Sequence, residues 1–471
     1  MASKDIAFSQ IPEGIRKPGV YTEFNLSGAI TALPANQYKL CVVGQRLAAG
    51  SAVANTVMDI FSSEDAAAYF GRGSTVHLAV LEALSANKYL SLQAVAVDDA
   101  VAGVAATAMV TITGPATASG ALTLNVNENS VSIPVANADT ASVIAAALNA
   151  QIAAQPNLQI TSTVLAGVVT ITAKNKGTLG NAIALSTKVQ AAGVAAVATA
   201  MAGGLNDPDM STALTAIYNA GHNIIISCFN DAANNTALKT HLNNVSGPLE
   251  KRRARAVIGN AGTYAQSVTM ATGINSGRIL EVLVPNSYEP SYEVAAVMAA
   301  IAASEPDPAR PLNNMELVGL TPPPLTNWLS ETQIEAALRN GVTATRVGPG
   351  NVVQIVRAVT TYTTNAAGIA DPTLLDWTTL GTLDYIANAI ETAIQLQCPR
   401  DKKTARTAEK LRDVIYGVMV KCEDAEYAKN VQKADILIED DLTDVTRTNT
   451  RIRVNVVSGQ HIIAQRLDLI L

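Results

Sequence analysis

Aromatic side chains are scarce in this sequence. Only 4% of its 471 residues are Phe, Trp or Tyr, whereas 48% are hydrophobic. The apolar content is therefore mostly Ala, Val, Leu and Ile, which can fill large cores with small side chains. Because Trp and Tyr dominate the hot spots of most recognition surfaces, we expect binding by this chain to depend little on aromatic anchors.

An excess of positive charge and long apolar runs are also missing. The formal net charge is −6, whereas a general nucleic-acid binder carries a basic surface, so we expect no nucleic-acid contact. No run of about 18 apolar residues is free of polar interruption, which predicts no direct membrane insertion. The opening segment MASKDIAFSQIPEG lacks the apolar stretch of a secretion signal. Assembly in a cytoplasm is expected because the cysteines, described next, are predicted to be buried reduced thiols.

Metal-ligand and disulfide patterns are missing too. The cysteines show no CxxC spacing and lie in or near apolar runs, which predicts buried reduced thiols, and the histidines share no metal-ligand spacing. Glu439, Asp440 and Asp441 are interpreted as a solvated turn rather than a cation site. The cysteines are Cys41, Cys228, Cys398 and Cys422, and the histidines are His77, His222, His241 and His461.

Two glycine-containing segments resemble nucleotide-binding loops only faintly. Residues 44–51 (GQRLAAGS) follow a predicted strand but lack the Lys-Ser/Thr pair of a phosphate loop, so we interpret them as a glycine-bounded turn. Residues 347–351 (VGPGN) contain Pro349, which removes a backbone donor. No Ser lies in a GxSxG motif. The sequence therefore predicts no catalytic residue, no cofactor and no metal.

The order of predicted elements indicates several domains, as expected for a chain of this length. Strands and helices alternate in residues 26–99 and again in 205–345, which predicts one layered α/β core domain. Residues 100–204 contain no Trp, Tyr, Phe or Arg and alternate in short strands, which predicts an inserted, mainly β outer domain. Residues 346–457 form a predicted α+β C-terminal domain. The fold class is therefore multidomain α/β and α+β, with exchangeable terminal strands.

Hydrophobic periodicity gives the elements of these domains. Helices are predicted at 63–69, 76–87, 140–151, 210–220, 232–244, 265–272, 292–304, 330–340, 374–396 and 404–422. Strands are predicted at 37–43, 89–97, 110–113, 122–126, 131–135, 160–164, 168–173, 222–229, 254–258, 278–284 and 352–360. Residues 305–324 are Pro-rich and predict an extended connector.

Both ends of the sequence have the alternation of β-strands. Near the end, Ile452, Val454 and Val456 alternate with polar residues, and a second alternation in 458–471 places Leu467, Leu469 and Leu471 on one face. A strand at the end of a domain has an open edge that needs a partner. We therefore expect residues 458–471 to add to a sheet, either in their own domain or in another subunit.

The first 25 residues repeat this pattern as an extended arm followed by a short strand. Val20, Tyr21 and Phe24 are the apolar members of that strand. Pro18-Gly19 and Ser458-Gly459 are predicted hinges, because proline and glycine break regular structure next to each terminal strand. The six predicted residues of inter-subunit strand exchange are Val20, Tyr21, Phe24, Leu467, Leu469 and Leu471.

Two basic segments are notable. Residues 251–255 (KRRAR) enter a predicted strand, and we interpret them as a solvated strand edge. A second group of basic residues lies at the start of a predicted helix, where the helix dipole disfavours cations. These residues either face an acidic partner or lie on a solvated face of the helix. The members of this group are Arg400, Lys402, Lys403, Arg406 and Lys410.

Several separated segments resemble the tail sheath proteins of Mu-like bacteriophages, in the same order along the chain. The resemblance covers nearly all of the sequence apart from residues 100–204. The segments are 11–24 (IPEGIRKPGVYTEF), 33–36 (LPAN), 43–46 (VGQR), 340–343 (NGVT), 346–350 (RVGPG) and 354–362 (QIVRAVTTY).

This resemblance implies a late viral structural protein of the virion tail and no enzymatic activity. In such sheaths, subunits stack as rings around a tail tube, terminal arms join neighbours, and contraction drives the tube through the host envelope for DNA ejection. The implied partners are further copies of the chain, the tail tube protein, and baseplate and tail terminator proteins. The Arg400–Lys410 group is then a candidate tube contact.

Two other classes remain open at this point. An α/β enzyme with a β accessory domain would need a cleft with convergent titratable residues, which the sequence does not indicate. A surface or adhesin-like structural protein would fit the Thr- and Val-rich β domain, but the opening residues do not resemble a secretion signal.

Overall fold

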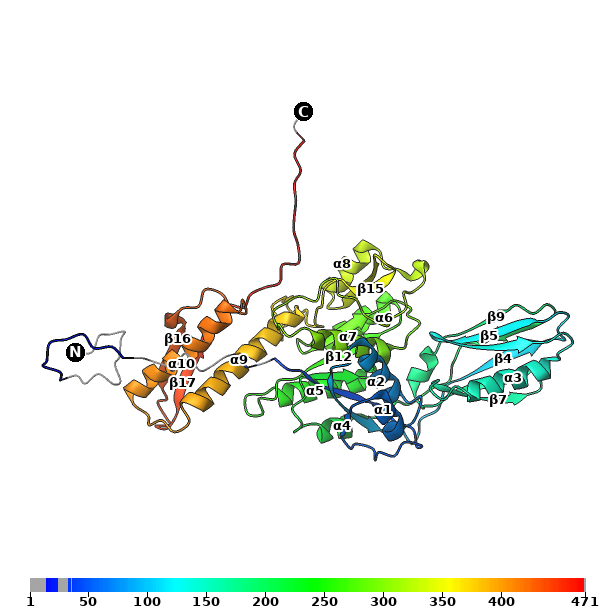
Figure 1. Ribbon diagram of the computed structural model, residues 1–471, viewed down its shortest axis with the longest axis horizontal. Helices are drawn as coiled ribbons and strands as arrows, with labels where there is room; N and C mark the ends of the chain where they lie inside the picture. Colours follow the sequence, from blue (N-terminus) through cyan, green and yellow to red (C-terminus); the bar gives the residue numbers. More distant parts are fainter. Residues whose placement is uncertain (1–13, 24–32, 35, 470–471) are drawn as a thin grey trace. The chain divides into compact units, whose positions relative to one another are not determined.

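The computed structural model describes residues 14–23, 33–34 and 36–469. Contacts divide the chain into two compact units, whose elements are labelled in Figure 1. The α/β unit comprises Asn36–Gly381 and Ser458–Leu471, and the terminal unit comprises Met1–Ala35 and Thr382–Val457. The mixed α/β multidomain fold class is thus confirmed.

An eight-stranded sheet is the centre of the α/β unit. Its spatial order is β15-β14-β13-β12-β11-β1-β3-β2, and all pairs are parallel except β2/β3 and β14/β15 at the two ends. Every residue of β11 and β13 is buried, as expected for parallel strands covered on both faces. The strands are β1 (Lys39–Gln45), β2 (Met58–Ile60), β3 (Ser91–Val97), β11 (Ile224–Ser227), β12 (Arg255–Asn260), β13 (Ile279–Leu283), β14 (Thr343–Gly348) and β15 (Val352–Ile355).

Helices cover both faces of this sheet. Leu40 and Val42 of β1 share a core with α1, α2 and α7, whereas Cys41 and Val43 point into a second core with α4, α5 and α6. A further core joins α6 and α8 beside β14. The helices are α1 (Ser63–Phe70), α2 (Thr75–Ala86), α4 (Ser211–Ala216), α5 (Ala232–Val245), α6 (Tyr264–Ile274), α7 (Ser291–Ser304) and α8 (Glu331–Arg339), with a 3-10 turn at Leu325–Asn327.

Small side chains set how closely α7 approaches the sheet. Helix α7 is Ala-rich and buries eleven of its fourteen residues. A Cβ atom on Gly259 of β12 would lie 1.9 Å from the carbonyl oxygen of Ser291 at the start of α7. This contact therefore requires glycine, and it explains why a core poor in aromatic residues packs tightly here.

Residues 100–204 form a β domain with its own core. Two sheets, β10-β4-β8-β7 and β6-β5-β9, and helix α3 enclose apolar residues that come only from this domain. Strand β4 alternates exposed and buried residues along its whole length, which is the pattern of a sheet with one solvated face. The elements are β4 (Thr107–Thr113), β5 (Gly120–Val126), β6 (Asn129–Val135), α3 (Ala141–Ala153), β7 (Ile160–Leu165), β8 (Val168–Ala173), a 3-10 turn (Thr178–Ala182), β9 (Leu185–Val189) and β10 (Ala195–Ala198).

The terminal unit is built from two long helices and a strand pair. Helices α9 (Trp377–Gln397), which starts in the α/β unit, and α10 (Ala405–Asp424) share a core with Ala428 and Ile436. After a 3-10 turn (Lys433–Asp435), β16 (Ile436–Asp440) and β17 (Thr448–Ile452) pair antiparallel over five residue pairs. Tyr385 of α9 donates a 2.7 Å hydrogen bond to the carbonyl of Pro34, which attaches the early chain to this unit.

Two sequence predictions differ from the structure in the α/β unit. The boundary expected at 345/346 lies instead between Gly381 and Thr382, because β14 and β15 extend the eight-stranded sheet. The strand expected over 352–360 ends at Ile355. The Pro-rich connector suggested a domain change, but an edge hairpin that joins the preceding sheet has the same sequence pattern as the first strands of a new domain.

The basic run 251–255 was predicted at a solvated edge, and this was wrong for Arg255. Strand β12 is an interior strand, and Arg255 is only 6% exposed. Its guanidinium carbon lies 4.1 Å from the ring centroid of Trp377, and Nη1 donates a 3.0 Å hydrogen bond to the Trp377 carbonyl. Stacking on an aromatic face satisfies a buried arginine in a way that the sequence around it does not reveal.

A buried carboxyl group in β13 makes the stability of the α/β unit depend on pH. Burial raises the pKa of Glu281 to about 8, against the smaller opposing effect of hydrogen bonds donated by Ser267 and Asn260. The group is therefore protonated when folded and ionised when unfolded between about pH 4.5 and pH 8. Because the folded state binds the extra proton, stability falls as pH rises through this window.

We predict that Glu281→Gln increases the free energy of unfolding at pH 8 by about 2–4 kcal/mol. The melting temperature at pH 8 should rise accordingly. The gain should shrink towards zero below pH 4.5, where the wild-type carboxyl becomes protonated in both states. Thermal melts at both pH values measure this, with the exposed Glu335→Gln as control. An equal gain at both pH values would show that the ionisation of Glu281 is not the cause.

Candidate functional site

The crevice where doubly wound sheets bind ligands is filled here by the chain's own inserted domain. Strand order reverses beside β1, which pairs with β3 on one side and β11 on the other, and ligands usually bind at the carboxyl ends of such strands. At that position Gln45 Nε2 donates to Asp99 Oδ1 (2.8 Å) and to the carbonyl of Lys176 (2.7 Å). Asn175 Nδ2 also donates to Asp99, at 3.1 Å.

The glycine-bounded turn predicted over residues 44–51 begins later than expected. Gly44 and Gln45 belong to strand β1, and the loop starts at Arg46. A Cβ atom on Gly44 would lie 2.7 Å from the Cys228 sulfur. Gly44 therefore allows β1 and the neighbouring strand to pack closely, and it does not form a phosphate-binding loop.

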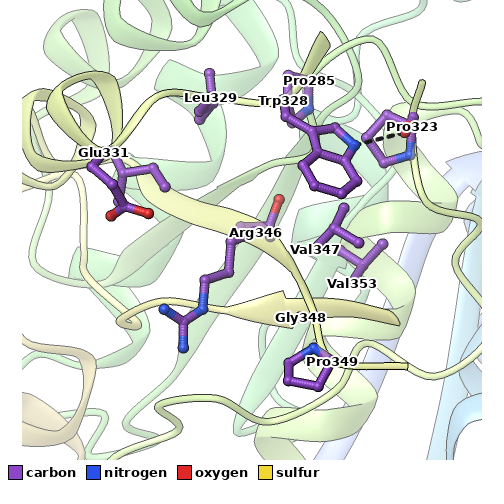
Figure 2. Close-up of a pocket in the computed structure, with 12 residues that line it drawn as sticks. Pro285, Pro323, Trp328, Leu329, Glu331, Arg346, Val347, Gly348, Pro349 and Val353 are labelled. Carbon is purple, nitrogen blue, oxygen red and sulfur yellow. Dashed lines mark hydrogen bonds between the residues drawn. The ribbon is translucent and has the colours of Figure 1, made fainter. Parts of the chain in front are cut away.

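A cavity of about 460 Å³ lies beside the β14–β15 hairpin (Figure 2). Trp328 forms one wall and donates from Nε1 to the carbonyl of Pro323 at 2.9 Å. Its ionisable lining residues are Glu331 and Arg346, and Arg346 also donates to Asn314 Oδ1 at 2.6 Å. The cavity is lined mainly by proline and apolar side chains, with one acidic and one basic residue. This lining does not contain the nucleophile and neighbouring base that a hydrolytic active site requires.

The histidines on the amino-terminal side of the sheet pack as core residues. His222 Nε2 lies 2.7 Å from Gln93 Oε1, and the ring of His241 packs edge-on against Tyr218 at 5.9 Å between centroids. Burial lowers the pKa of both histidines to about 4, so both are neutral near pH 7. Within the described residues, no group of three or more His, Cys, Asp or Glu side chains is arranged to hold a metal ion.

Of the acidic residues 439–441, only Asp441 lies in the predicted turn, because Glu439 and Asp440 belong to β16 and pair with β17. Asp441 follows β16 and accepts hydrogen bonds from the backbone of Thr443 and Asp444 and from Asn449 Nδ2. These donors hold the pKa of the Asp441 carboxyl well below its usual range. Its oxygens are therefore used to close the β16–β17 connection.

The cysteines are free thiols in the interior. Cys41, Cys228 and Cys422 are buried, and Cys398 is half-buried. Burial raises the pKa of Cys41 to about 12 and that of Cys422 to about 11. Such thiols are protonated at neutral pH and unreactive, in agreement with the expected reduced state.

The C-terminal tail lacks a partner strand in the described chain. Val456 still bridges to Ala428, but the residues from Ser458 to Leu469 form no strand; the extended red segment of Figure 1 is this tail. Leu467 and Leu469 are 94% and 84% exposed, and Ile462 is 82% exposed. The strand predicted for this segment is thus not formed in the single chain, and Leu471 lies outside the described residues.

The leader is similar where the structure describes it. Residues 14–23 form no strand, Val20 is 97% exposed, and Tyr21 donates a 2.8 Å hydrogen bond from its hydroxyl to the carbonyl of Lys17. The predicted hinge residues Pro18 and Gly19 are exposed, whereas Phe24 lies outside the described residues. The predicted hinge at Ser458-Gly459 differs from Pro18-Gly19 because its backbone is packed against a neighbouring residue. A Cβ atom on Gly459 would lie 2.4 Å from Pro311.

The terminal unit contains a sheet of only two strands. Among the described residues, β16 and β17 pair with each other and with no further strand. Each therefore has one edge without a strand partner in this part of the chain. Arg412 of α10 supports the pair by donating from Nε to the carbonyl of Ile436 at 3.2 Å. A two-stranded sheet is marginal alone, so these edges are suited to receive additional strands.

The basic group at the start of α10 is only partly free. Lys403 Nζ lies 3.2 Å from Asp440, and Lys410 Nζ lies 2.9 Å from Asp401. Arg400, Lys402 and Arg406 are exposed, and the described contacts show no ion pair for these three side chains. The structure therefore brings two of the five predicted cations into internal pairs and leaves three on the surface.

Comparison with known proteins gives consistent matches. Residues 203–361 match the family model described as phage tail sheath protein central domain. The chain is 29% identical to the Mu-like prophage FluMu tail sheath protein of Haemophilus influenzae over 486 aligned positions, covering 99% of this chain and 100% of the relative. Within the described residues, no helix is both long and apolar enough to cross a membrane.

Solved structures show the same fold at low sequence identity. The sheath tail protein of Listeria innocua has a TM-score of 0.51 at 15% identity and covers 94% of this chain and 97% of its own. That of Desulfitobacterium hafniense has a TM-score of 0.53 at 15% identity, with the same coverage. The anti-feeding prophage helical sheath in its contracted state has a TM-score of 0.51 at 12% identity, covering 96% and 98%.

We predict that Asp99→Ala loosens the junction of the inserted domain. The change leaves the amides of Gln45 and Asn175 without their carboxylate acceptor, and an unsatisfied buried donor costs about 1–3 kcal/mol. Trypsin should then cleave after Lys174 and Lys176 about tenfold faster, measured by mass spectrometry of timed digests. Asp98→Ala is the control, since it removes only a surface ion pair with Arg46. Equal cleavage rates in both variants would contradict this role of Asp99.

Proposed function

We propose that this chain is a phage tail sheath protein, and that its copies polymerise into a contractile sheath joined by exchange of their terminal segments. The observation that supports the exchange most directly is a pairing deficit within one subunit. The tail exposes an alternating apolar segment without a partner strand in the described chain. The β16–β17 sheet has two edges without a further strand among the described residues.

Strand addition between subunits would pair both the exposed tail and the open edges of the β16–β17 sheet. Tail residues 462–469 and leader residues 20–24 would supply main-chain donors and acceptors to the edges of β16 and β17 in neighbouring subunits. Each hydrogen bond contributes only about 1 kcal/mol net, but several per arm and two arms per subunit give a strong connection. Leu467, Leu469 and Leu471 would lie on the buried face, together with Val20, Tyr21 and Phe24 from the other arm.

The same connection explains how a sheath can shorten without dissociating. Hydrogen bonds within an added strand move with the sheet that they join, so they survive rotation of the rigid units. In this proposal the extended sheath is a higher-energy packing, and contraction releases free energy through new contacts between α/β units. No nucleotide is required, in line with the crevice that the inserted domain fills.

The wider partners follow from this role. Subunits would stack as rings around a tail tube, and the three exposed cations Arg400, Lys402 and Arg406 would contact an acidic tube surface. Baseplate and tail terminator proteins would contact the ends of the polymer; anti-feeding prophage baseplate structures also resemble this chain, with a TM-score of 0.50. The protein would assemble in the host cytoplasm, act in the virion tail during DNA ejection, and have no enzymatic activity.

We predict that Leu467→Asp with Leu469→Asp abolishes polymerisation. Charged side chains on the buried face would oppose strand addition, whereas the subunit itself should melt at an unchanged temperature because both residues are exposed in the single chain. Negative-stain electron microscopy of purified protein measures the presence of tubes or rings. Arg466→Ala with Asp468→Ala is the matched control on the opposite face of the same tail. Normal tubes from the leucine variant would falsify the proposed exchange.

We predict a similar result when the leader is removed through Phe24, because this deletion takes away residues 20–24, which the proposed exchange uses. The truncated chain should remain soluble and folded, because the described leader residues 14–22 are exposed, but it should form no long sheaths. Sedimentation and electron microscopy measure the loss. A mixture of tagged wild-type and truncated chains gives a second readout, since the truncated chain should terminate growing polymers. Full-length polymers made from the truncated chain alone would contradict a role for the leader.

A further inference from the structure

Three covalent connections join the α/β unit to the terminal unit. The chain passes between the units after residue 35, after Gly381 and after Val457. The described contacts on the α/β side show how each connection begins. Together they form a closed ring of interactions on one part of this unit.

The first connection starts at Asn36. Its Nδ2 atom donates to the hydroxyl of Tyr38 and to the carbonyl of Pro306, both at 2.9 Å. Arg255 then links this segment to the second connection, because its guanidinium lies 5.9 Å from the Tyr38 ring centroid and 4.1 Å from that of Trp377. Trp377, which is 3% exposed, begins helix α9.

The second connection is held by close packing. A Cβ atom on Gly381 would lie 2.6 Å from Arg255 Nη1, so α9 passes directly over the buried guanidinium just before the chain leaves the unit. Asp376, next to Trp377, forms two 2.8 Å hydrogen bonds with Arg357. The first turn of α9 is therefore fixed to the α/β unit from both sides.

The third connection is the root of the C-terminal tail. Asn313 Nδ2 donates to His461 Nδ1 at 2.9 Å, and His461 Nε2 lies 3.5 Å from Asp376 Oδ1. The backbone at Gly459 approaches Pro311 too closely for any larger residue. Residues 306–313 thus contact the first connection through Pro306 and the third through Pro311 and Asn313, which closes the ring.

We propose that these residues form a single anchor patch, from which all three connections leave, and that the patch stays intact while the terminal unit moves. Its principal members are Tyr38, Arg255, Asn313, Asp376, Trp377 and His461. Three connections that start at one rigid base let the terminal unit turn as a body, whereas widely separated starting points would resist rotation. His461 is then the positioning residue of the tail, because it fixes the point from which residues 462–469 reach a neighbour.

The anchor can be tested first in the unassembled full-length chain, where the result does not depend on the proposed function. His461→Ala should increase cleavage by proteinase K within residues 458–463 at least tenfold in timed digests, and Asn313→Ala should do the same through loss of the same hydrogen bond. Gln465→Ala, in the exposed tail, is the control and should change nothing there. Unchanged cleavage in both anchor variants would overturn the proposal.

The claim that the anchor persists during movement rests on the proposed sheath function and needs assembled particles. In a Cys398→Ser background, Asn313→Cys and His461→Cys can be joined by a short bismaleimide cross-linker. Bridged chains should assemble, and their sheaths should contract in sub-denaturing guanidinium to the same extent as unbridged ones. Bridged sheaths that stay extended would overturn the persistent anchor, whereas the tail-leucine variants test the exchange itself.

Discussion

The main feature of this structure is an exposed, alternating apolar tail that has no partner strand among the described residues. Exposed main-chain donors and acceptors beside alternating apolar side chains have lower free energy when another strand covers them. In the single described chain, the tail from Ile462 to Leu469 has no such cover, and neither outer edge of the β16–β17 pair has a further described strand. In the proposed sheath, other copies of the chain would supply the missing partner strands for both features.

The α/β unit is closely packed on both faces of its central sheet. Its parallel sheet is buried on both faces, and its Ala-rich helix α7 lies so close to β12 that only glycine fits at position 259. The crevice next to β1 is occupied by hydrogen bonds among Gln45, Asp99 and the inserted domain. Such close packing makes the unit suited to move as one body.

The anchor patch connects these two properties. Arg255, Trp377 and Asp376 place the start of α9 and the root of the tail on the same part of the rigid unit. A flexible segment can transmit displacement between subunits only when its starting point is fixed. If the starting point is loose, the linker changes conformation and the neighbouring subunit does not move. The structure therefore combines a tail that has no partner strand among the described residues with a well-defined starting point for that tail.

The sequence by itself determined the helices, most of the buried strands and the β domain of residues 100–204, since hydrophobic periodicity and turn residues are local properties. The strand character of both ends stays a prediction, because the described residues 14–23 and 458–469 form no strand. It did not determine that β14 and β15 extend the first sheet, that Arg255 is buried against Trp377, or that Gly459 is fixed beside Pro311. Each of these depends on residues brought together from distant positions in the chain. Pairing of the terminal segments depends on still more distant residues, because their proposed partners lie in other subunits. In this proposal, the contact between subunits and not the local sequence decides whether a strand forms.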